Sequence, residues 1–274
     1  MNLTALSEIA IRAARAAGAL IRQRAAEELV VSLKTETGGT SYAAQVVTEV
    51  DRACEALILS HLKPTLKSHD LGLLSEETED DGSRFARDYF WCIDPLDGTL
   101  PFLQRRSGYA VAIALVARDG TPRIGVVCDP TTETIYHATR GGGAFKNGQP
   151  WHIERTNNHF TYVTDRTLAK TPRRPEIEQL LTARAAELGL TKVRELAGGG
   201  SVMNAIRVLE NGPACLLKFP KPERGGGGIW DFAATVCLFH ELQLPATDFF
   251  GQPLDLNRAD GVFMNHRGVF FANW

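Results

Sequence analysis

Hydrophobic positions divide the chain into a helical start, a strand-rich centre and a second half in which helices and strands alternate. Apolar residues recur at helical spacing through residues 6–20, which predicts a long amphipathic helix. A second helix is predicted from Val46 to about Leu62, where Thr48 and Asp51 have the spacing of a capping box. Lys34 and the segment 38–45 lie between these helices in a stretch rich in Gly, Thr and Ser, which is typical of a loop.

The centre of the chain contains several apolar runs without helices between them. The run from Tyr89 to Ile93 predicts a buried strand that ends at Asp94. Asp119-Gly120 and Asn147-Gly148 supply hairpin turns. The predicted strands after the first are 109–117, 123–128, 134–138 and 144–145. Consecutive strands of this kind predict antiparallel pairing.

Helices and strands alternate after a change of composition near residues 151–158. The predicted strands are 160–164, 192–196 and 214–219, and the predicted helices are 175–188, 201–210 and 232–242. We therefore expect an N-terminal α+β domain over 1–155 and a C-terminal α/β domain over 156–274. The start of the 201–210 helix, at Gly198-Gly199-Gly200-Ser201, is a place where backbone amides can hold an anion or a hydroxyl.

Composition narrows the class of protein. The 274 residues are 44% hydrophobic with a formal net charge of −2, so charge gives no reason to expect a nucleic-acid polymer or a membrane as partner. The first residues are amphipathic and do not resemble a secretory signal. The five cysteines are scattered without CxxC spacing, which indicates reduced thiols and a cytoplasmic protein.

The segment Asp94-Pro95-Leu96-Asp97-Gly98-Thr99 follows the predicted strand and carries candidate chemistry. Its two carboxylates are three positions apart, so both side chains can reach one cation. Gly98 allows a tight turn, and the amides of Gly98 and Thr99 can face a phosphate oxygen. The sequence therefore predicts a cation and a phosphate side by side.

Two more acidic residues have positions suited to metal binding. Glu76 follows a short apolar run, and Asp231 begins an apolar helix after four glycines. Taken alone, Glu76 belongs to a solvated acidic loop, and Asp231 and Asp51 are helix caps. Together with Asp94 and Asp97 they form an oxygen-only ligand set, which favours Mg²⁺, with Mn²⁺ as a substitute, over zinc. No GxSxG, Walker lysine or HExxH motif competes, so the expected chemistry is attack on a phosphate ester by a metal-activated water.

These motifs, in this order and spacing, closely resemble the inositol monophosphatase superfamily. The resemblance rests on Asp94–Thr99, Ser75-Glu76-Glu77, Ile229-Trp230-Asp231 and Val47–Asp51, and it extends to Asp255. It implies an alternating αβαβα layered fold and a Mg²⁺-dependent, lithium-sensitive phosphatase with two or three Mg²⁺ ions per site. The implied metal ligands are Glu76, Asp94, the carbonyl of Leu96, Asp97 and Asp231.

The resemblance also implies roles for individual residues. Glu76 orients the attacking water, and Thr99 and Asp51 share its proton. Gly98 and Thr99 bind the phosphate through their amides. The expected substrate contacts are Asp97, Gly98, Thr99, Gly200, Ser201, Arg224 and Asp231.

The substrate is inferred from a finer likeness to the 3′(2′),5′-bisphosphate nucleotidase (CysQ-like) branch, in 74–77, 252–255 and 263–268. Inositol monophosphatases place a glutamate that contacts inositol hydroxyls seven residues before the Asp231 position, where this chain has Arg224. A guanidinium suits a second phosphate better than a polyol. The leading hypothesis is therefore removal of the 3′-phosphate of adenosine 3′,5′-bisphosphate.

Other readings remain open. Inositol 1-phosphate is the alternative substrate, followed by a sugar bisphosphate. A non-catalytic metal- or phosphate-binding regulator on the same fold is a further alternative. Leu100-Pro101 and Gln243-Leu244 depart from the family pattern. The expected partner is a small-molecule phosphate ester, bound by a monomer or a homodimer.

Overall fold

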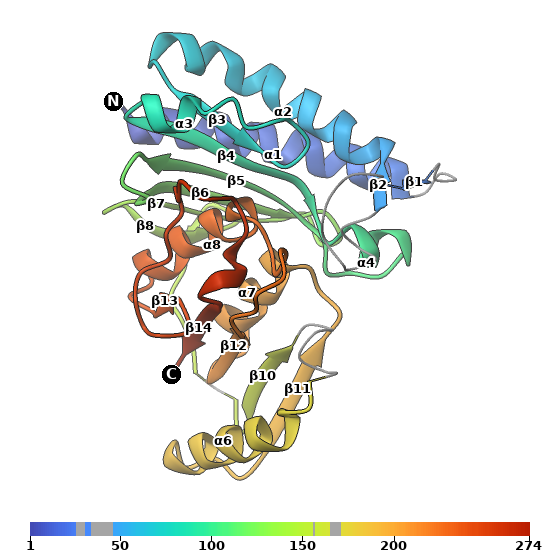
Figure 1. Ribbon diagram of the computed structural model, residues 1–274, viewed down its shortest axis with the longest axis vertical. Coiled ribbons are helices and arrows are strands. Elements are labelled where there is room, and N and C mark those ends of the chain that lie inside the picture. The colour runs from blue at the N-terminus through green and yellow to red at the C-terminus, as the bar shows by residue number, and fades with distance from the viewer. Residues whose placement is uncertain (26–30, 34–45, 156, 165–170) are drawn as a thin grey trace.

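Two large β-sheets and three layers of helices alternate in the order α, β, α, β, α, and a separate two-stranded sheet lies outside these layers (Figure 1). The computed structural model describes residues 1–25, 31–33, 46–155, 157–164 and 171–274, with the backbone alone at 31–33 and 46–48. Lys34 and the segment 38–45 lie outside the described residues. The layered fold implied by the sequence motifs is confirmed.

The larger sheet has seven strands in chain order, β3-β4-β5-β6-β7-β8-β9. They are β3 (Gly72–Ser75), β4 (Tyr89–Asp97), β5 (Ala110–Ala117), β6 (Pro122–Asp129), β7 (Thr134–Thr139), β8 (Gly143–Lys146) and β9 (Gln149–Pro150). The β3–β4 pair is parallel, and every later pair is antiparallel. The predicted meander is therefore confirmed.

Helices cover both faces of this sheet because its strands are apolar on both sides. Trp91 and Ile93 of β4 pack in the core formed with α1 (Leu3–Ala25) and α2 (Glu49–Ser68). Phe90 and Cys92 point to the opposite core, which includes the middle helices. This alternation follows from the two-residue period of a strand. All five cysteines are free and buried.

The middle layer consists of α7 (Ser201–Glu210) and α8 (Ile229–Glu241). Their apolar side chains share one core with both sheets. At Gly125 of β6, an added Cβ would lie 2.2 Å from the Ala234 carbonyl oxygen, so the backbones of β6 and α8 are in direct contact. Only glycine allows this approach.

The smaller sheet has five strands in the order β11-β10-β12-β14-β13. They are β10 (Phe160–Thr164), β11 (Val193–Ala197), β12 (Ala214–Lys218), β13 (Ala246–Thr247) and β14 (Val269–Asn273). Helix α6 (Arg174–Glu187) covers its outer face. The remaining elements are β1 (Val31–Leu33), β2 (Val46–Thr48), α3 (Ser83–Ala86), α4 (Thr99–Leu103) and the 3₁₀ turn η2 (Met264–His266).

Two predicted boundaries near the candidate chemistry were wrong. The second helix starts at Glu49, because 46–48 form a short strand paired with β1. Strand β4 does not end before Asp94 but continues to Asp97. Asp94 pairs with Ala112 and Asp97 with Ala110, so β4 carries one extra residue there and forms a bulge. Pro95, which has no amide hydrogen, lies inside that bulge.

None of the described helices is long and apolar enough to span a lipid bilayer. The first sheet ends at Pro150 and the second begins at Phe160, but α7 and α8 pack on both. The division into domains 1–155 and 156–274 stays a prediction.

Candidate functional site: a cluster of carboxylates between two layers

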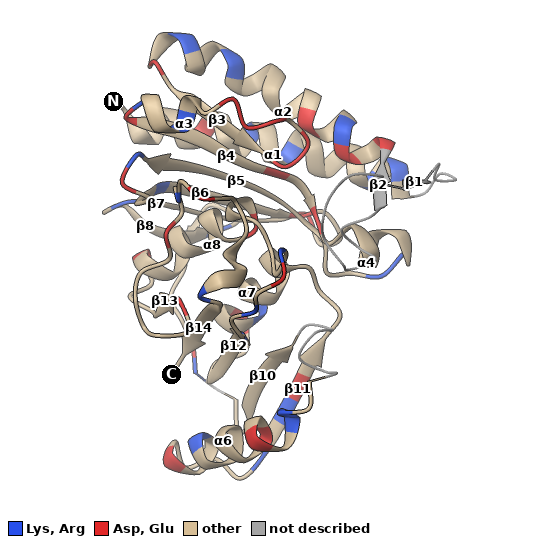
Figure 2. Ribbon diagram, in the orientation of Figure 1, with Lys and Arg blue, Asp and Glu red and all other residues tan. Residues whose placement is uncertain are grey.

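Three aspartates from two distant parts of the chain meet where β4, α7 and α8 come together. One carboxylate oxygen each of Asp94, Asp97 and Asp231 lies within 4.8 Å of the others. Among the described residues, this is the one group of three or more acidic, His or Cys side chains with such spacing. Asp94 and Asp97 lie on the β4 bulge, and Asp231 lies in the first turn of α8. Figure 2 shows acidic positions along β4 and on the segment after β3.

The carboxylate of Asp97 binds the amino terminus of α7. Its Oδ1 accepts a hydrogen bond from the amide of Ser201 at 3.0 Å, and its Oδ2 accepts one from the amide of Val202 at 2.8 Å. A helix start favours an anion because its first amides are unpaired within the helix. The sequence predicted that this helix start can hold an anion, and the anion it holds in the structure is Asp97. The substrate contacts assigned to Gly200 and Ser201 stay predictions.

Glycines make this contact possible. A Cβ on Gly200 would lie 2.2 Å from Asp97 Oδ2, and the Gly200 amide donates to the Gly108 carbonyl at 2.7 Å. Gly98, which precedes α4, has φ of +83°, and an added Cβ would lie 2.8 Å from the same carbonyl oxygen. The backbone segments at Gly98, Gly108 and Gly200 therefore approach too closely for a side chain at Gly98 or Gly200.

Asp94 lies at the centre of the acidic group. It is 1% exposed, and its Oδ1 accepts a hydrogen bond from the amide of Leu96 at 3.1 Å. Burial raises its pKa well above the ordinary value, and the negative charges of Glu76, Asp97, Asp231 and Asp51 raise it further. The structure thus brings the other four sequence-predicted carboxylates close enough to act on Asp94.

Asp97 is also held above its ordinary pKa. Burial is the largest cause and the charge of Asp231 the next, while the Val202 amide and the ammonium of Lys218 oppose them. Several buried carboxylates without a cation repel one another, and a bound divalent cation removes that cost. An oxygen-only donor set of this kind fits Mg²⁺. The residues present therefore suit the implied metal.

The remaining predicted ligands have distinct local settings. Asp231 is the third residue of α8, and its Oδ2 accepts a hydrogen bond from the Gly228 amide, so it also caps the helix. The Leu96 side chain is fully buried in the outer core, while its carbonyl accepts a hydrogen bond from Thr99 Oγ1 at 3.4 Å. Glu76 comes directly after β3 and lies outside the 4.8 Å group.

The start of α8 is tied to the carboxy-terminal segment. The Ile229 amide donates to the Val262 carbonyl at 2.8 Å, and the Met264 amide donates to the Gly227 carbonyl at 2.9 Å. These backbone bonds hold both sides of the turn that precedes Asp231. The earlier part of the loop is bound to the same segment, since the Lys221 amide donates to the Asn265 carbonyl at 2.8 Å.

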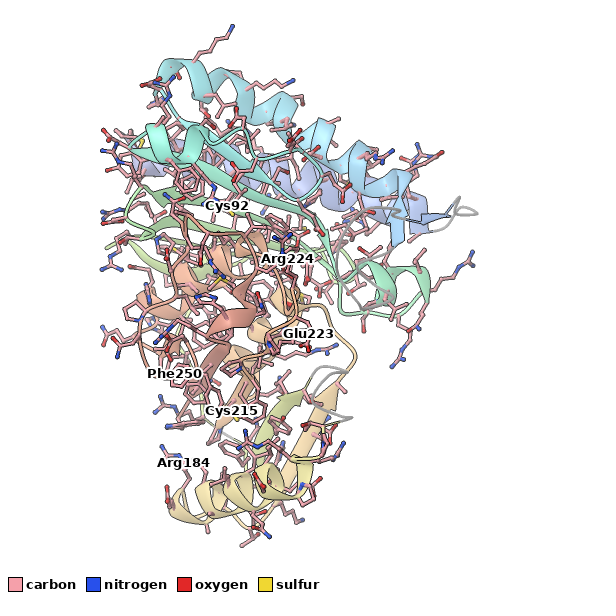
Figure 3. The ribbon with its side chains drawn as sticks, viewed as in Figure 1. Cys92, Arg184, Cys215, Glu223, Arg224 and Phe250 are labelled. Carbon is pink, nitrogen blue, oxygen red and sulfur yellow. The ribbon has the colours of Figure 1, made fainter. Side chains whose placement is uncertain are left out.

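Arg224, which the sequence singled out, and Lys218 lie in different settings. Arg224 is exposed on the loop that leads to α8 (Figure 3). Lys218, the last residue of β12, is half-buried and donates from Nζ to Ser201 Oγ at 2.8 Å and to the Gly226 carbonyl at 3.1 Å. Its charge acts on Asp97, so Lys218 is part of the electrostatics of the site.

Sequence reasoning missed Glu55. This buried residue of α2 accepts hydrogen bonds from the hydroxyls of Ser75 and Thr78, on either side of Glu76. The available signal was its spacing: Glu55 follows Asp51 by four residues, so both lie on the same face of α2. That face also carries apolar core residues, where a carboxylate is unusual.

We predict that Gly200→Ala weakens cation binding. The backbone at Gly200 has φ of −65°, which alanine tolerates, so the effect comes from the clash of Cβ with the Asp97 carboxylate. Displacing this side chain should weaken Mg²⁺ binding about tenfold or more, measured by titration calorimetry. Gly142→Ala, in an exposed hairpin turn, is the control and should bind as the parent does. Equal affinities in both variants would contradict the assignment.

A second prediction concerns pH and the metal-free protein. Because the folded-state pKa values of Asp94 and Asp97 exceed those of the unfolded chain, the folded state holds more protons above about pH 4. This contribution to stability is present at low pH and is lost as pH rises toward the folded-state values. The free energy of unfolding, measured with urea in the presence of EDTA, should fall between pH 5 and 8 in the parent. It should fall less steeply in Asp94→Asn. Parallel curves for the two proteins would count against a repulsive cluster.

Comparison with known proteins agrees with this geometry. The family model described as "Inositol monophosphatase family" matches residues 2–271. "Inositol monophosphatase 2" of Rattus norvegicus is 31% identical over 252 residues, which are 91% of this chain and 81% of the relative. An inositol monophosphatase from Anabaena superposes with a TM-score of 0.72 at 23% identity, covering 100% of this chain and 92% of that one.

A further solved structure is that of SaIMPase-II of Staphylococcus aureus with 2′AMP bound. It has a TM-score of 0.71 at 21% identity and covers 98% of this chain and 90% of that one. At such identity the solved structures establish the fold alone. The chain belongs to the inositol monophosphatase family, and the prediction of a metal-dependent phosphoric monoester hydrolase is confirmed at this level.

Proposed function

We propose that this chain removes the phosphate from a small-molecule phosphate monoester that carries a second anionic group. The observation that carries the proposal is the position of Lys218, a half-buried ammonium whose charge acts on Asp97 of the carboxylate cluster. The leading substrate is adenosine 3′,5′-bisphosphate, cleaved at its 3′-phosphate. Cytoplasmic location and a monomeric or homodimeric state belong to this proposal.

We infer that the metal is Mg²⁺, two or three ions per site, with Mn²⁺ as a substitute. The residues that would hold it are Glu76, Asp94, Asp97, Asp231 and the carbonyl of Leu96. When bound, Mg²⁺ neutralises charge on the phosphate and lowers the pKa of water. The raised pKa of Asp94 supports this assignment, because only a cation allows so many neighbouring carboxylates to ionise together.

The chain's own groups then position the reactants. Glu76 orients the attacking water, and Thr99 and Asp51 take up its proton. The Thr99 hydroxyl donates to the Leu96 carbonyl in the structure, so it lies beside the β4 bulge that carries Asp94 and Asp97. The amides of Gly98 and Thr99 bind phosphate oxygens, as amides at a turn or helix start do. Holding water and ester in line is the main contribution of such a site.

Lys218 and Arg224 support the second anionic group. Beyond the reacting phosphate, an ester of an uncharged polyol offers no second anion to Lys218, whereas a bisphosphate does. Arg224, exposed on the loop before α8, adds a planar donor that suits a phosphate. SaIMPase-II, whose structure contains 2′AMP, is a relative of this fold that accommodates a nucleotide monophosphate.

Inositol 1-phosphate is the second candidate. The rat relative is named an inositol monophosphatase, and the family carries the same name. A substrate that is a polyol monophosphate would make Lys218 a structural group that holds Ser201 and the Gly226 carbonyl. A sugar bisphosphate is the third candidate, and it shares the second phosphate with the leading one.

The substrate is tested by phosphate release from adenosine 3′,5′-bisphosphate, inositol 1-phosphate and a sugar bisphosphate at equal Mg²⁺. We expect the highest kcat/KM with the nucleotide. Lys218→Met should raise KM for the nucleotide about tenfold more than KM for inositol 1-phosphate, because both substrates lose the effect of Lys218 on Asp97 and only the nucleotide loses a partner for its second phosphate. The control is Lys192→Met, which removes an exposed lysine just before β11. Faster turnover of inositol 1-phosphate by the parent would overturn the leading substrate.

Lithium provides an independent test of the cation site. Li⁺ is a small cation that binds oxygen ligands, and we expect it to inhibit phosphate release when Mg²⁺ is below saturation. The rate is measured against Li⁺ concentration at two levels of Mg²⁺, with K⁺ as the control salt. An unchanged rate at high millimolar Li⁺ would exclude a lithium-sensitive position in this ligand set.

A further inference from the structure

Helix α2 carries a second buried carboxylate besides Asp51. Glu55 is 8% exposed and lies one helical turn after Asp51, which is 3% exposed. Its Oε1 accepts a hydrogen bond from the Ser75 hydroxyl, and its Oε2 accepts one from the Thr78 hydroxyl at 2.9 Å. One carboxylate thus binds two side chains that are three positions apart.

The two hydroxyl donors lie on either side of Glu76. Ser75 is the last residue of β3, and it pairs with Ile93 of β4 in the parallel register. The Glu76 amide donates to the Ile93 carbonyl at 3.2 Å, one residue before Asp94. The backbone at Glu76 is therefore bound to β4, and the side chains flanking it are bound to α2.

We propose that Glu55 is a positioning residue that holds Glu76 at the distance from Asp94 and Asp51 that cation binding requires. Asp51 and Glu55 are four residues apart on one helix, so their separation is fixed. The bonds from Glu55 to Ser75 and Thr78 therefore also fix the distance between Asp51 and the backbone at Glu76. A carboxylate suits this role because its two oxygens accept from two donors at a fixed separation. This inference rests on the proposed function, since it assigns Glu76 to the metal.

The bonds of Glu55 are separate from those that stabilise the rest of the acidic loop. Asp80 accepts a hydrogen bond from Arg84 at 2.7 Å, and its other oxygen accepts one from the Gly82 amide at 3.0 Å. Arg84 in turn donates to Asn257 at 2.8 Å. Residues 80–84 are thus bound to the carboxy-terminal segment, and Thr78, which is exposed, contributes its hydroxyl to Glu55. Removing that hydroxyl leaves these other contacts intact.

The experiment is calorimetric titration of the full chain with Mg²⁺ in the absence of substrate, so that the readout does not depend on turnover. Thr78→Val keeps the side-chain shape and should weaken Mg²⁺ binding about fivefold, and Glu55→Ala should weaken it about tenfold or more. Glu55→Gln keeps one acceptor oxygen and should recover most of the affinity lost in Glu55→Ala. Glu49→Ala, an exposed position in the first turn of the same helix, is the matched control and should bind as the parent does.

Kinetics separate positioning from general loss of structure. In Thr78→Val the Mg²⁺ concentration for half-maximal rate should rise, while KM for the phosphate ester and the rate at saturating Mg²⁺ stay close to those of the parent. The double variant Thr78→Val, Glu55→Ala should bind Mg²⁺ no more weakly than Glu55→Ala alone, because both changes remove the same bond.

Each outcome decides. Parent-like Mg²⁺ affinity in Thr78→Val and Glu55→Ala would overturn the role of Glu55 while leaving the proposed function standing. A parent protein that binds no Mg²⁺ would overturn the proposed function, and this inference with it. If Glu55→Ala does not fold, Thr78→Val and Ser75→Ala decide by the same measurement.

Discussion

The hydrogen bonds from the α7 amides to the Asp97 carboxylate are the interaction on which the site depends. They join a residue at the end of a strand in the seven-stranded sheet to a helix that packs between the two sheets. Gly200 gives the room for this contact, since any Cβ there would overlap the carboxylate. The amides favour the charged form of Asp97, whereas burial and Asp231 oppose it. The same bonds therefore position a candidate ligand and keep it suited to a cation.

Much of the site was predictable because its chemistry is concentrated in short motifs. Asp94, Asp97 and Asp231 were expected to meet, and they do. The path of the backbone was harder to predict from the sequence. The strand was expected to end before Asp94, but a bulge at Pro95 extends it to Asp97. Counting residues back from Asp231 selected Arg224, whereas the cation that acts on Asp97 is Lys218. A count of residues along a loop does not give the position of a side chain in space. The contact of Lys218 with Ser201 forms only when β12 and α7 pack together.

The carboxylates around Asp94 also explain why the outer helices belong to the site. Asp51 and Glu55 are on α2, which covers the face of the large sheet away from α7 and α8. Their carboxylates nevertheless act at the carboxyl ends of β3 and β4, on Asp94 and on the residues flanking Glu76. The acidic group is thus assembled from three layers of the fold, and its geometry depends on the packing of both cores.

The turn before α8 has an evolutionary consequence. Backbone bonds from Gly227 and Ile229 to the segment 262–264 hold the start of α8, and with it Asp231. Residues 219–226, which include Arg224, lie upstream of those bonds. Arg224 is exposed there, so a change of its charge leaves those backbone bonds in place. A substitution at such a position changes the charge that a substrate meets without removing a bond that holds Asp231, so recognition can evolve separately from the placement of this carboxylate.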